Sequence, residues 1–550
     1  MLTEHAVVKA LQENGTTHWF GFPGETTLPL YNAMEDAGVF HFLARDERCA
    51  AHMADAYARI TGKTGVCDAP AGMGVPFLCP ALLEAYNSSS PVLAVVSSTP
   101  LDKRGRWPTS ELDQAGLLSP ITKAQFLVAD AETAAKTTHN AYREARKNRP
   151  RPVLLEITYD LFGKNSGYER GGPIDPVVEN APDKLIRAAA SALASSKKPA
   201  ILAGGGVFLS GAERELKGLC ETLGIPVATT LTGKGCLPED HPLSLGVVGG
   251  KGRPFANIYV SSSDCVLVLG SKLGEKATNR WTLIKNEPSV IRVDIDEKEL
   301  ANNYPRATRI RGDIKKILKK MVAAATNPTA GNARTRIAEL KKAWLDSFEK
   351  SCEYPGTSIK PQTVIRELQR LAPKNTILVA DGSVSSGWAG ACWNANGTGR
   401  RFIAGRGTGM IGFALPAAIG AKIGAPNDPV VSLAGDGGFM FSAEELEAAK
   451  RHGIPFVQII FNNSALGLLQ LHEQYVYKRS AIPSFSAIDF CRLSEALGAQ
   501  AIAIDRKSEV PDGIRSALHA DGPVVLDVKI DASELSPDFK NTLARKGIRI

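Results

Sequence analysis

Residues 430–463 contain two apolar runs, VVSLA and FVQIIF, and each run ends in polar residues. A glycine-rich turn around Asp436 follows the first run, and an asparagine pair ending at Asn463 follows the second. The segment between them predicts a helix, because Ser442 and Glu445 have the spacing of a capping box and a glycine and a proline follow the pattern. Strand, helix and strand in this order form a right-handed crossover between parallel strands. Both polar signals are therefore expected at the carboxyl edge of one sheet, where ligands bind in such folds.

The two polar signals together suit a metal-bound diphosphate. A carboxylate and an amide carbonyl are hard oxygen ligands, which Mg²⁺ and Ca²⁺ prefer. Glycines allow backbone N–H groups to approach a phosphate, and a nearby helix start adds its positive end. The alternative is two ordinary turns, because Gly, Asp and Asn are common turn residues. The pair, separated by 24 residues (438–461) across one crossover, favours the metal–diphosphate site.

Apolar runs alternate with helical patterns along the whole chain, which predicts an α/β fold with doubly wound parallel sheets. Two stretches rich in Gly, Pro or charge, 162–182 and 325–336, read as linkers, and a third breaker-rich stretch covers 352–361. The first and third segments could share a fold, but their sequences do not show it. The expected domains are residues 1–165, 180–330 and 355–550.

Composition excludes several classes of protein. The net charge of +8 is spread over 550 residues without a basic stripe, so no nucleic-acid partner is expected. No apolar run reaches the roughly 18 residues of a membrane span, so no membrane partner is expected. The first 15 residues predict an amphipathic helix and lack the apolar centre of a signal peptide. Nine scattered cysteines without a C-x-x-C pair indicate reduced thiols and a cytoplasmic location.

Gly-Asp-Gly followed about two dozen residues later by Asn-Asn resembles the signature of thiamine-diphosphate (ThDP) enzymes. The resemblance implies that Asp436, Asn463 and the backbone carbonyl of Ala465 hold Mg²⁺. It also implies a set of cofactor-binding residues at neighbouring strand ends. These are Asp381, Gly382, Ser383, Gly435, Asp436, Gly437, Gly438, Asn463, Leu466 and Gly467.

A second signal is FHFLARDERCAAHMADAYARITGKTGV, residues 40–66. It resembles the family's strand followed by a glutamate that opens an alanine-rich helix. The resemblance identifies Glu47 as the carboxyl that hydrogen-bonds the aminopyrimidine ring and promotes loss of the thiazolium C2 proton. A carboxyl group in apolar surroundings has a raised pKa and can share that proton. On the residues alone, Glu47 could equally complement the helix dipole, a role that also suits Asp46.

The glycine-rich stretch GRGTGMIGFALPAAIGAK, residues 405–422, resembles the segment that grips the cofactor between its two rings. By this resemblance Ile411 is the bulky residue that wedges beneath the bend, with Met410 as the alternative. The carbonyl of Gly409 would accept a hydrogen bond from the aminopyrimidine amine. Without the resemblance, the stretch predicts only the start of a buried helix.

The resemblance extends over nearly the whole chain and is closest to the acetolactate-synthase-like group. It implies pyrimidine-binding, central and diphosphate-binding domains. It also implies that the cofactor lies between the first domain of one subunit and the third domain of its neighbour, so a homodimer is the minimum and a homotetramer is expected. The matching blocks are residues 18–34, 111–123, 226–249 and 291–300.

Several positions depart from acetolactate synthases. Glu25 stands where those enzymes have glycine, Ser110 stands where they have glutamine, and Lys276 occupies the place of an arginine. His472 replaces a large aromatic residue nine positions after the metal asparagine. We interpret Glu25, Ser110 and His472 as substrate-facing residues. The alternatives are a solvated loop residue for Glu25 and a packing residue for His472.

The expected activity is formation or cleavage of a C–C bond beside the carbonyl of a 2-oxo acid or related acyl donor, in a carboligase or lyase. The alternatives are simple decarboxylation, a flavin- or nucleotide-binding redox enzyme, and a catalytically silent homologue. FAD is possible but not expected. The glycines at 204–206 do not complete a G-x-G-x-x-G pattern, and residues 272–276 lack the Arg-Phe-Asp-Asp-Arg stretch of flavin-containing relatives.

Overall fold

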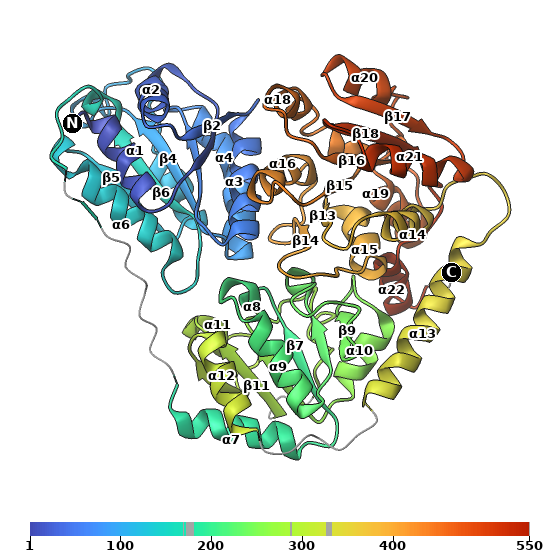
Figure 1. Cartoon of the computed structure of the whole chain (residues 1–550). Helices are drawn as coiled ribbons and strands as arrows, with labels where there is room; N and C mark the ends of the chain where they lie inside the picture. The colour runs from blue at the N-terminus through green and yellow to red at the C-terminus, as the bar shows by residue number, and fades with distance from the viewer. Residues whose placement is uncertain (169, 172–180, 286–288, 326–332, 549–550) are drawn as a thin grey trace.

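The computed structural model describes residues 1–168, 170–171, 181–285, 289–325 and 333–548. Figure 1 shows three lobes, coloured blue, green to yellow and orange to red along the chain. Each lobe is built around one sheet of six strands. We call these lobes the N-terminal, central and C-terminal units. The sheets confirm the predicted α/β class with three parallel-sheet units.

The N-terminal sheet has the order β2-β1-β3-β4-β6-β5, and every pair of neighbours is parallel. Its central strands are buried along their whole length, as expected for a sheet covered by helices on both faces. The strands are β1 (His18–Gly21), β2 (Phe40–Leu43), β3 (Gly65–Ala69), β4 (Val92–Ser98), β5 (Ala124–Val128) and β6 (Val153–Thr158). The helices are α1 (Thr3–Glu13), α2 (Leu28–Asp36), α3 (Glu47–Thr61), α4 (Gly74–Ser88), α5 (Gln114–Leu118) and α6 (Ala134–Arg146).

The C-terminal sheet is also entirely parallel, in the order β14-β13-β15-β16-β18-β17. The strands are β13 (Ile377–Ala380), β14 (Phe402–Ala404), β15 (Val430–Gly435), β16 (Val457–Asn462), β17 (Gln500–Ile504) and β18 (Val524–Lys529). The helices are α14 (Pro361–Leu371), α15 (Ser383–Cys392), α16 (Ala414–Gly424), α17 (Asp436–Phe439), α18 (Glu445–Arg451), α19 (Gly467–His472), α20 (Phe490–Ala496), α21 (Val510–Leu518) and α22 (Pro537–Arg545).

The central sheet has a different order, β12-β11-β10-β7-β8-β9, again with parallel neighbours. The strands are β7 (Pro199–Ala203), β8 (Val227–Thr229), β9 (Ser244–Val247), β10 (Cys265–Leu269), β11 (Val290–Asp294) and β12 (Thr308–Arg311). The helices are α7 (Asp183–Ser195), α8 (Gly206–Leu209), α9 (Glu213–Leu223), α10 (Pro254–Ser261), α11 (Glu297–Ala301) and α12 (Ile314–Ala324), and α13 (Ala333–Cys352) leads to the C-terminal unit.

The first and third units share one topology. Numbered from its own first strand, each sheet has the order 2-1-3-4-6-5, whereas the central sheet has the order 3-2-1-4-5-6 found in dinucleotide-binding folds. In all three sheets the order reverses beside the first strand, and ligands bind outside the carboxyl ends of the strands at such a point. The fold therefore predicts one ligand-binding edge in each unit.

The crossover at 430–463 is confirmed, because β15 and β16 are parallel neighbours with Gly435 opposite Phe461. Two local predictions need correction. The glycine-rich turn is one turn of helix, α17, which begins at Asp436. The capping box is absent, because α18 begins at Glu445 and its N-cap is Glu444 rather than Ser442. Glu445 instead accepts hydrogen bonds from backbone N–H groups of the N-terminal unit.

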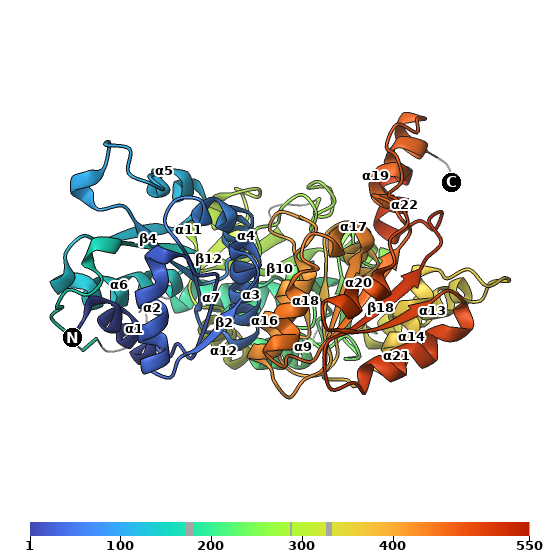
Figure 2. The same cartoon turned by 90° about the horizontal axis from the view of Figure 1, so that it is seen from above.

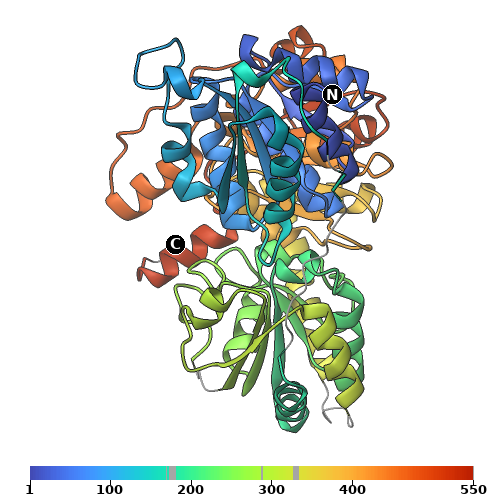
Figure 3. The same ribbon diagram turned by 90° about the vertical axis from the view of Figure 1, so that its left-hand side faces the viewer.

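The N-terminal and C-terminal units pack directly on each other. Helices α3 and α16 lie side by side at the centre of Figure 1, and one apolar core runs through both units. Viewed from the left, these two units overlap and the central unit lies beneath them (Figure 3). Seen from above, α19 and α22 protrude from the body of the molecule (Figure 2). None of the described helices combines the length and apolar character needed to cross a bilayer.

The described residues cover the three predicted domains but not all of the predicted linkers between them. The three sheets fall within residues 1–165, 180–330 and 355–550. However, much of the predicted linkers lies outside the described residues, at 169, 172–180 and 326–332. The exact limits therefore stay predictions. All nine cysteines are free thiols.

Candidate functional site

The carboxyl ends of β15 and β16 bring the two polar signals together. The Asp436 carboxylate accepts hydrogen bonds from the backbone N–H of Gly437 at 2.8 Å and of Ala465 at 3.1 Å. Burial raises the pKa of Asp436, and these backbone N–H groups oppose the rise. The bond to Ala465 ties the turn after β16 to the turn after β15. The three residues predicted to hold a metal are thus gathered at one sheet edge.

The two asparagines after β16 have different surroundings. Asn462 is buried, its amide donates to Asp527 at 2.7 Å, and its carbonyl oxygen accepts from the N–H of Ser464 at 3.2 Å. Asn463 is half-buried, and its side chain makes no hydrogen bond to any residue that the structure describes. Asn462 therefore fixes the turn, while the amide of Asn463 is left available to a ligand.

Glycines allow four separate segments to meet around this edge. A Cβ added at Gly438 would lie 2.1 Å from Asp381 Oδ2 and 3.6 Å from the Cβ of Ile411. One added at Gly382 would lie 2.6 Å from the Gly409 carbonyl and 2.3 Å from that of Met410. In the same way, a Cβ added at Gly437 would press against the side chain of Leu466, and one added at Gly467 would press against the amide of Asn463. The structure thus brings together the predicted cofactor-binding segments 381–383, 409–411, 435–438 and 463–467.

Asp381 organises this edge from within the C-terminal unit. Its buried carboxylate accepts from the N–H groups of Gly412 at 3.0 Å, Phe413 at 2.9 Å and Ala414 at 3.2 Å. Burial raises the pKa of Asp381 to about 6, and the backbone N–H groups oppose that rise. The carboxylate thereby caps α16 and holds the end of the segment that carries Ile411. A direct contact of Asp381 with the cofactor stays a prediction.

Helix α15 begins at Ser383, beside the turn after β13, with φ of +64° at this residue. Its first turn receives Lys251 from the central unit. Lys251 Nζ donates to the Ser383 carbonyl at 2.9 Å and also to the hydroxyl of Ser386. Burial lowers the pKa of Lys251 to about 8. A helix start with a cation beside it suits an anionic group such as a diphosphate.

Glu47 lies at the corresponding edge of the N-terminal sheet, as the first residue of α3. Asp46 caps the helix by accepting from the N–H of Cys49 at 2.7 Å, so the dipole-capping role falls to Asp46. Glu47 is 7% exposed and accepts no hydrogen bond from another residue of the described chain. Burial raises its pKa to about 7, with a further contribution from Asp46. This is a carboxyl group that can hold or release a proton near neutral pH.

Close contacts join Glu47 to the loops around it. A Cβ at Gly74 would lie 2.7 Å from Glu47 Oε1 and 2.6 Å from Pro70, and one at Gly24 would lie 2.5 Å from Pro70. Glu25, the residue after Gly24, is exposed and makes no hydrogen bond or ion pair with any described residue. The opening loop, the loop at 70–74 and Glu47 therefore form one edge. Among the described residues, no hydrogen bond joins Glu47 to the turns after β15 and β16 of the C-terminal unit, which carry the predicted metal ligands.

A network that sequence reasoning missed holds the 70–74 loop. The N–H of Ala71 donates to Ser97 at 2.9 Å and to Thr26 at 3.1 Å. The N–H of Gly72 donates to Gln114 at 3.0 Å, and the Gln114 amide donates to the Ser97 carbonyl at 3.0 Å. Gln114 belongs to the block at 111–123, so its position in that block was the available signal.

Ser110, predicted to face the substrate, lies against this same loop. It has φ of +68°, and a Cβ at Gly72 would lie 2.7 Å from its Cβ. Ser110 is exposed, so its hydroxyl is free to contact a ligand or a second chain. Its substrate-facing role stays a prediction that this position permits.

His472 lies apart from these loops, at the end of α19. Its ring packs edge-on against Phe539 of α22, with ring centroids 4.9 Å apart. Burial lowers the pKa of His472, and the positive charges of Lys546 and Lys276 lower it further. Lys276 is itself exposed, 3.6 Å from Glu275. The geometry favours the packing alternative for His472.

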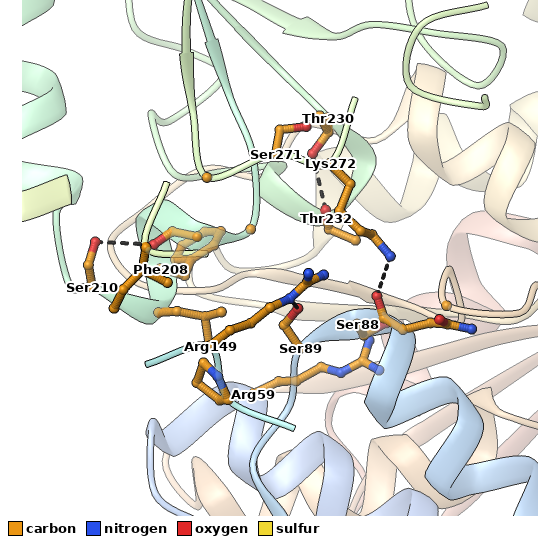
Figure 4. Close-up of a pocket in the computed structure, with 18 of the residues that line it drawn as sticks. Arg59, Ser88, Ser89, Arg149, Phe208, Ser210, Thr230, Thr232, Ser271 and Lys272 are labelled. Carbon is orange, nitrogen blue, oxygen red and sulfur yellow. Dashed lines mark hydrogen bonds between the residues drawn. The ribbon is translucent and has the colours of Figure 1, made fainter. Parts of the chain in front are cut away.

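A cavity of about 950 Å³ lies at the switch point of the central sheet, beside the ends of β7 and β10, and residues of all three units line it (Figure 4). Gly204 and Gly206 contact the turn at Gly270 so closely that no side chain fits there. Six arginines and three lysines line the cavity, against four acidic residues. Arg400 lies over the Phe208 ring at 4.5 Å, and burial lowers its pKa to about 10. The cavity therefore favours an anionic ligand of nucleotide size.

The C-terminal edge fits a metal-bound diphosphate. It offers a carboxylate, a free amide and a backbone carbonyl as oxygen donors, and a cradle of glycines next to them that a Cβ would fill. Asp436 and Asn463 would hold the metal, and the start of α15 would receive the diphosphate. The N-terminal edge offers the carboxyl that such a cofactor needs.

Comparison with known proteins agrees with this geometry. Sequence profiles of thiamine pyrophosphate (TPP) enzymes match all three units: the N-terminal TPP binding domain at residues 1–117, the central domain at 186–321 and the C-terminal TPP binding domain at 381–528.

The chain is also similar along almost its whole length to acetolactate synthase large subunits. The probable large subunit of Methanocaldococcus jannaschii is 35% identical, covering 97% of this chain and 92% of that protein. The probable large subunit of Methanococcus aeolicus is 34% identical, with 96% and 92% covered. The isozyme 2 large subunit of Escherichia coli is 32% identical, with 96% and 95% covered. The chain therefore belongs to the thiamine pyrophosphate enzymes, in the family of the acetolactate synthase large subunits.

Proposed function

We propose that this ThDP enzyme also requires Mg²⁺ and forms or cleaves a C–C bond beside the carbonyl of a 2-oxo acid or related acyl donor. The observation that carries the proposal is the gathering of Asp436, Asn463 and Ala465 at one sheet edge, together with a free, buried Glu47 at the matching edge of the N-terminal unit. When bound, ThDP supplies the electron sink for such chemistry.

The residues of this chain divide the work between binding and proton transfer. Asp436, Asn463 and the Ala465 carbonyl hold the metal and thereby the diphosphate. With ThDP bound, the Gly409 carbonyl would accept from the aminopyrimidine amine and Ile411 would pack between the two rings. Glu47 would share a proton with the ring nitrogen, which a pKa of about 7 allows at neutral pH.

We propose a homodimer as the smallest active unit. Both units expose several large apolar side chains, and exposed apolar surface of this kind marks an interface. On the N-terminal unit they are Met73, Phe77, Leu101, Trp107, Leu112 and Leu117. On the C-terminal unit they are Met440, Phe441, Leu469, Tyr477 and Phe485. A second copy that places its N-terminal edge against this C-terminal edge would cover both sets and complete the cofactor site. A homotetramer of two such dimers follows the family resemblance.

Carboligation or acyl lysis is favoured over simple decarboxylation by the similarity to acetolactate synthases. The acceptor, however, is expected to differ from a second pyruvate. Glu25 stands exposed at the edge that carries Glu47, and an ionised carboxylate there repels an incoming carboxylate. Lys276 could offset part of this repulsion but lacks the bidentate geometry of arginine. The acceptor is therefore expected to be an aldehyde or another uncharged compound, or a proton.

The test supplies the holoenzyme with 2-oxo acids, alone and paired with aldehydes, and identifies products by mass spectrometry. Pyruvate alone is expected to give little acetolactate, and Glu25→Gly is expected to raise it. Turnover of pyruvate to acetolactate on the order of 10 per second by the unaltered enzyme would overturn the Glu25 argument. The absence of any product with ThDP and Mg²⁺ from every donor would overturn the proposed activity.

The cavity at the switch point of the central sheet, which all three units line, favours a second, separate binding function. We propose that it takes a phosphate-bearing nucleotide, because basic residues dominate its lining and glycines surround the switch point. FAD stays possible, although we expect the purified protein to be colourless. ADP is expected to raise the melting temperature, whereas adenosine is not. A flavin absorption band at one equivalent per chain would contradict the expected absence of FAD.

A further inference from the structure

Glu84 of the N-terminal unit lies inside the contact with the C-terminal unit. It is fully buried on α4, and both carboxylate oxygens face the loop at 405–411. Glu84 Oε1 accepts from the N–H of Gly407 at 2.8 Å. Glu84 Oε2 accepts from the N–H of Thr408 at 2.7 Å and from its hydroxyl at 3.1 Å. One side chain thus anchors two consecutive backbone N–H groups of a loop more than 300 residues away.

The carboxylate of Glu84 is held in its charged form. Burial alone would raise its pKa, but Arg59 and the two backbone N–H groups lower it to about 2. Arg59 donates to Glu84 at 3.1 Å and to Asp55 at 2.8 Å, and it also donates to the Ala404 carbonyl at 3.2 Å. Hydrogen bonds to a charged acceptor are about twice as strong as neutral ones. Arg59 and Glu84 therefore fix the start of the loop from the N-terminal unit.

The contact is closely fitted. A Cβ added at Gly407 would lie 2.4 Å from the backbone carbonyl of Glu84 and 2.9 Å from its Oε2. Asp381 holds the other end of the same segment through Gly412 to Ala414. The residues between these anchors are Gly409, Met410 and Ile411, which are the residues proposed to grip the cofactor.

We propose that Glu84 is a positioning residue for the cofactor, which places the Gly409 carbonyl and Ile411 by holding Gly407 and Thr408. The inference rests on the proposed roles of Gly409 and Ile411. It adds a residue of the N-terminal unit that acts on the C-terminal unit of its own chain. In the proposed dimer, each N-terminal unit then serves two sites. Glu47 opens α3 and reaches the partner's cofactor, while Arg59, about 18 Å farther along the same helix, supports the loop of its own chain.

The experiment compares two ligands that use different halves of the site. ThDP needs the loop at 409–411 as well as the turns after β15 and β16 and the start of α15, whereas inorganic diphosphate with Mg²⁺ needs those turns and the start of α15 but not the loop. Glu84→Gln removes the charge and places an amide group against a backbone N–H. We expect the affinity for ThDP, measured by calorimetry, to fall by about tenfold to a hundredfold, while the affinity for inorganic diphosphate stays unchanged. Exchange of the thiazolium C2 proton in the saturated variant should also slow.

A matched control is Glu239→Gln. Glu239 is likewise buried and charged, pairs with Lys234 at 2.6 Å, and accepts from the N–H of Ala395 in the C-terminal unit at 2.8 Å. It lies away from the cofactor loop, so this variant should lose stability without losing ThDP affinity. Thr408→Val, at an exposed position, removes the hydroxyl that donates to Glu84 and accepts from the N–H of Met410 at 3.4 Å. It loosens the same loop and should weaken ThDP binding in the same direction even if Glu84→Gln does not fold.

The outcomes separate this inference from the proposed function. Unchanged ThDP affinity and C2 exchange in folded Glu84→Gln or Thr408→Val would overturn the inference. An equal loss of ThDP and diphosphate binding would also overturn it, because the effect would then not be confined to the loop. If the unaltered protein bound neither ligand with Mg²⁺, the proposed metal–cofactor site itself would be wrong.

Discussion

At the scale of single residues, the asparagine pair shows how identical neighbours take different roles. The family resemblance selected Asn463 as the metal ligand, and the structure supplies a physical reason. The side chain of Asn462 is already hydrogen-bonded to Asp527 and to the N–H of Ser464. A pattern of residue types could not reveal this, because Asp527 lies 65 residues farther along the chain.

The pair gives a direct prediction. Asn463→Ala should lose Mg²⁺-dependent ThDP binding in calorimetry while its urea unfolding midpoint stays near that of the unaltered protein. Asn462→Ala should lower the free energy of unfolding by about 1–3 kcal/mol, because it leaves one carboxylate oxygen of the buried Asp527, Oδ1, without its hydrogen-bond donor. If Asn463→Ala bound ThDP as tightly as the unaltered protein, the proposed metal site would be wrong.

Glu47 and Asp46 form a second pair of neighbours with separable roles. Glu47→Gln should still bind ThDP but exchange the C2 proton about 10²–10⁴-fold more slowly, because the amide cannot share a proton. Asp46→Asn is the control: it weakens the cap of α3 and removes a secondary contribution to the raised pKa of Glu47, so it should lower stability while the exchange rate changes far less than in Glu47→Gln. NMR of acid-quenched samples measures the exchange rate. Equal rates in Glu47→Gln and the unaltered enzyme would leave Glu47 without a role in activation.

At the scale of secondary structure, strands and helices were predictable where the apolar residues follow one clear period along the sequence. The crossover at 430–463 and the helix that Glu47 opens are examples. The start of α18 was not predictable. Glu445 has the spacing of a capping residue, but its carboxylate is used by the N–H groups of Arg45 and Asp46 in another unit. Tertiary contact thus replaced the local cap.

This contact predicts a pH dependence of stability. Burial raises the pKa of Glu445 to about 8, so the folded state holds a proton that the unfolded state releases near pH 4.5. The stability from this group is therefore fully present below pH 4.5 and is lost as pH rises through 8. Glu445→Gln cannot ionise. The free energy of unfolding of this variant, relative to that of the unaltered protein, should therefore rise by up to a few kcal/mol between pH 6 and pH 9.

Urea unfolding at pH 6 and pH 9 measures this difference, with Glu447→Gln as the control. Glu447 lies on the same helix, but its bond to Arg451 lowers its pKa. Its removal should therefore cost stability slightly at both pH values rather than produce a gain at pH 9. A constant difference between Glu445→Gln and the unaltered protein across this range would show that Glu445 is already ionised in the fold.

At the scale of the whole molecule, the sequence predicted the class and the number of sheets but not the relation between them. The identical strand order of the first and third sheets is invisible in the residues, because buried parallel strands accept many apolar sequences. Packing between units was equally hidden. Glu84 contacts a loop that follows it by 323 residues, and no local pattern encodes such a distance.

The proposed dimer makes the last prediction. If each cofactor lies between one chain's Glu47 and its partner's Asp436, then Glu47→Gln and Asp436→Ala damage opposite sides of the same site. A mixed dimer of the two variants then contains one site with both lesions and one site with neither. Random pairing makes about half of the dimers mixed, so co-expressed variants should recover about one quarter of the unaltered activity. Each variant alone should be nearly inactive. Activity no higher than that of the single variants, in a sample where tandem affinity tags confirm mixed dimers, would place both residues in a site formed within one chain.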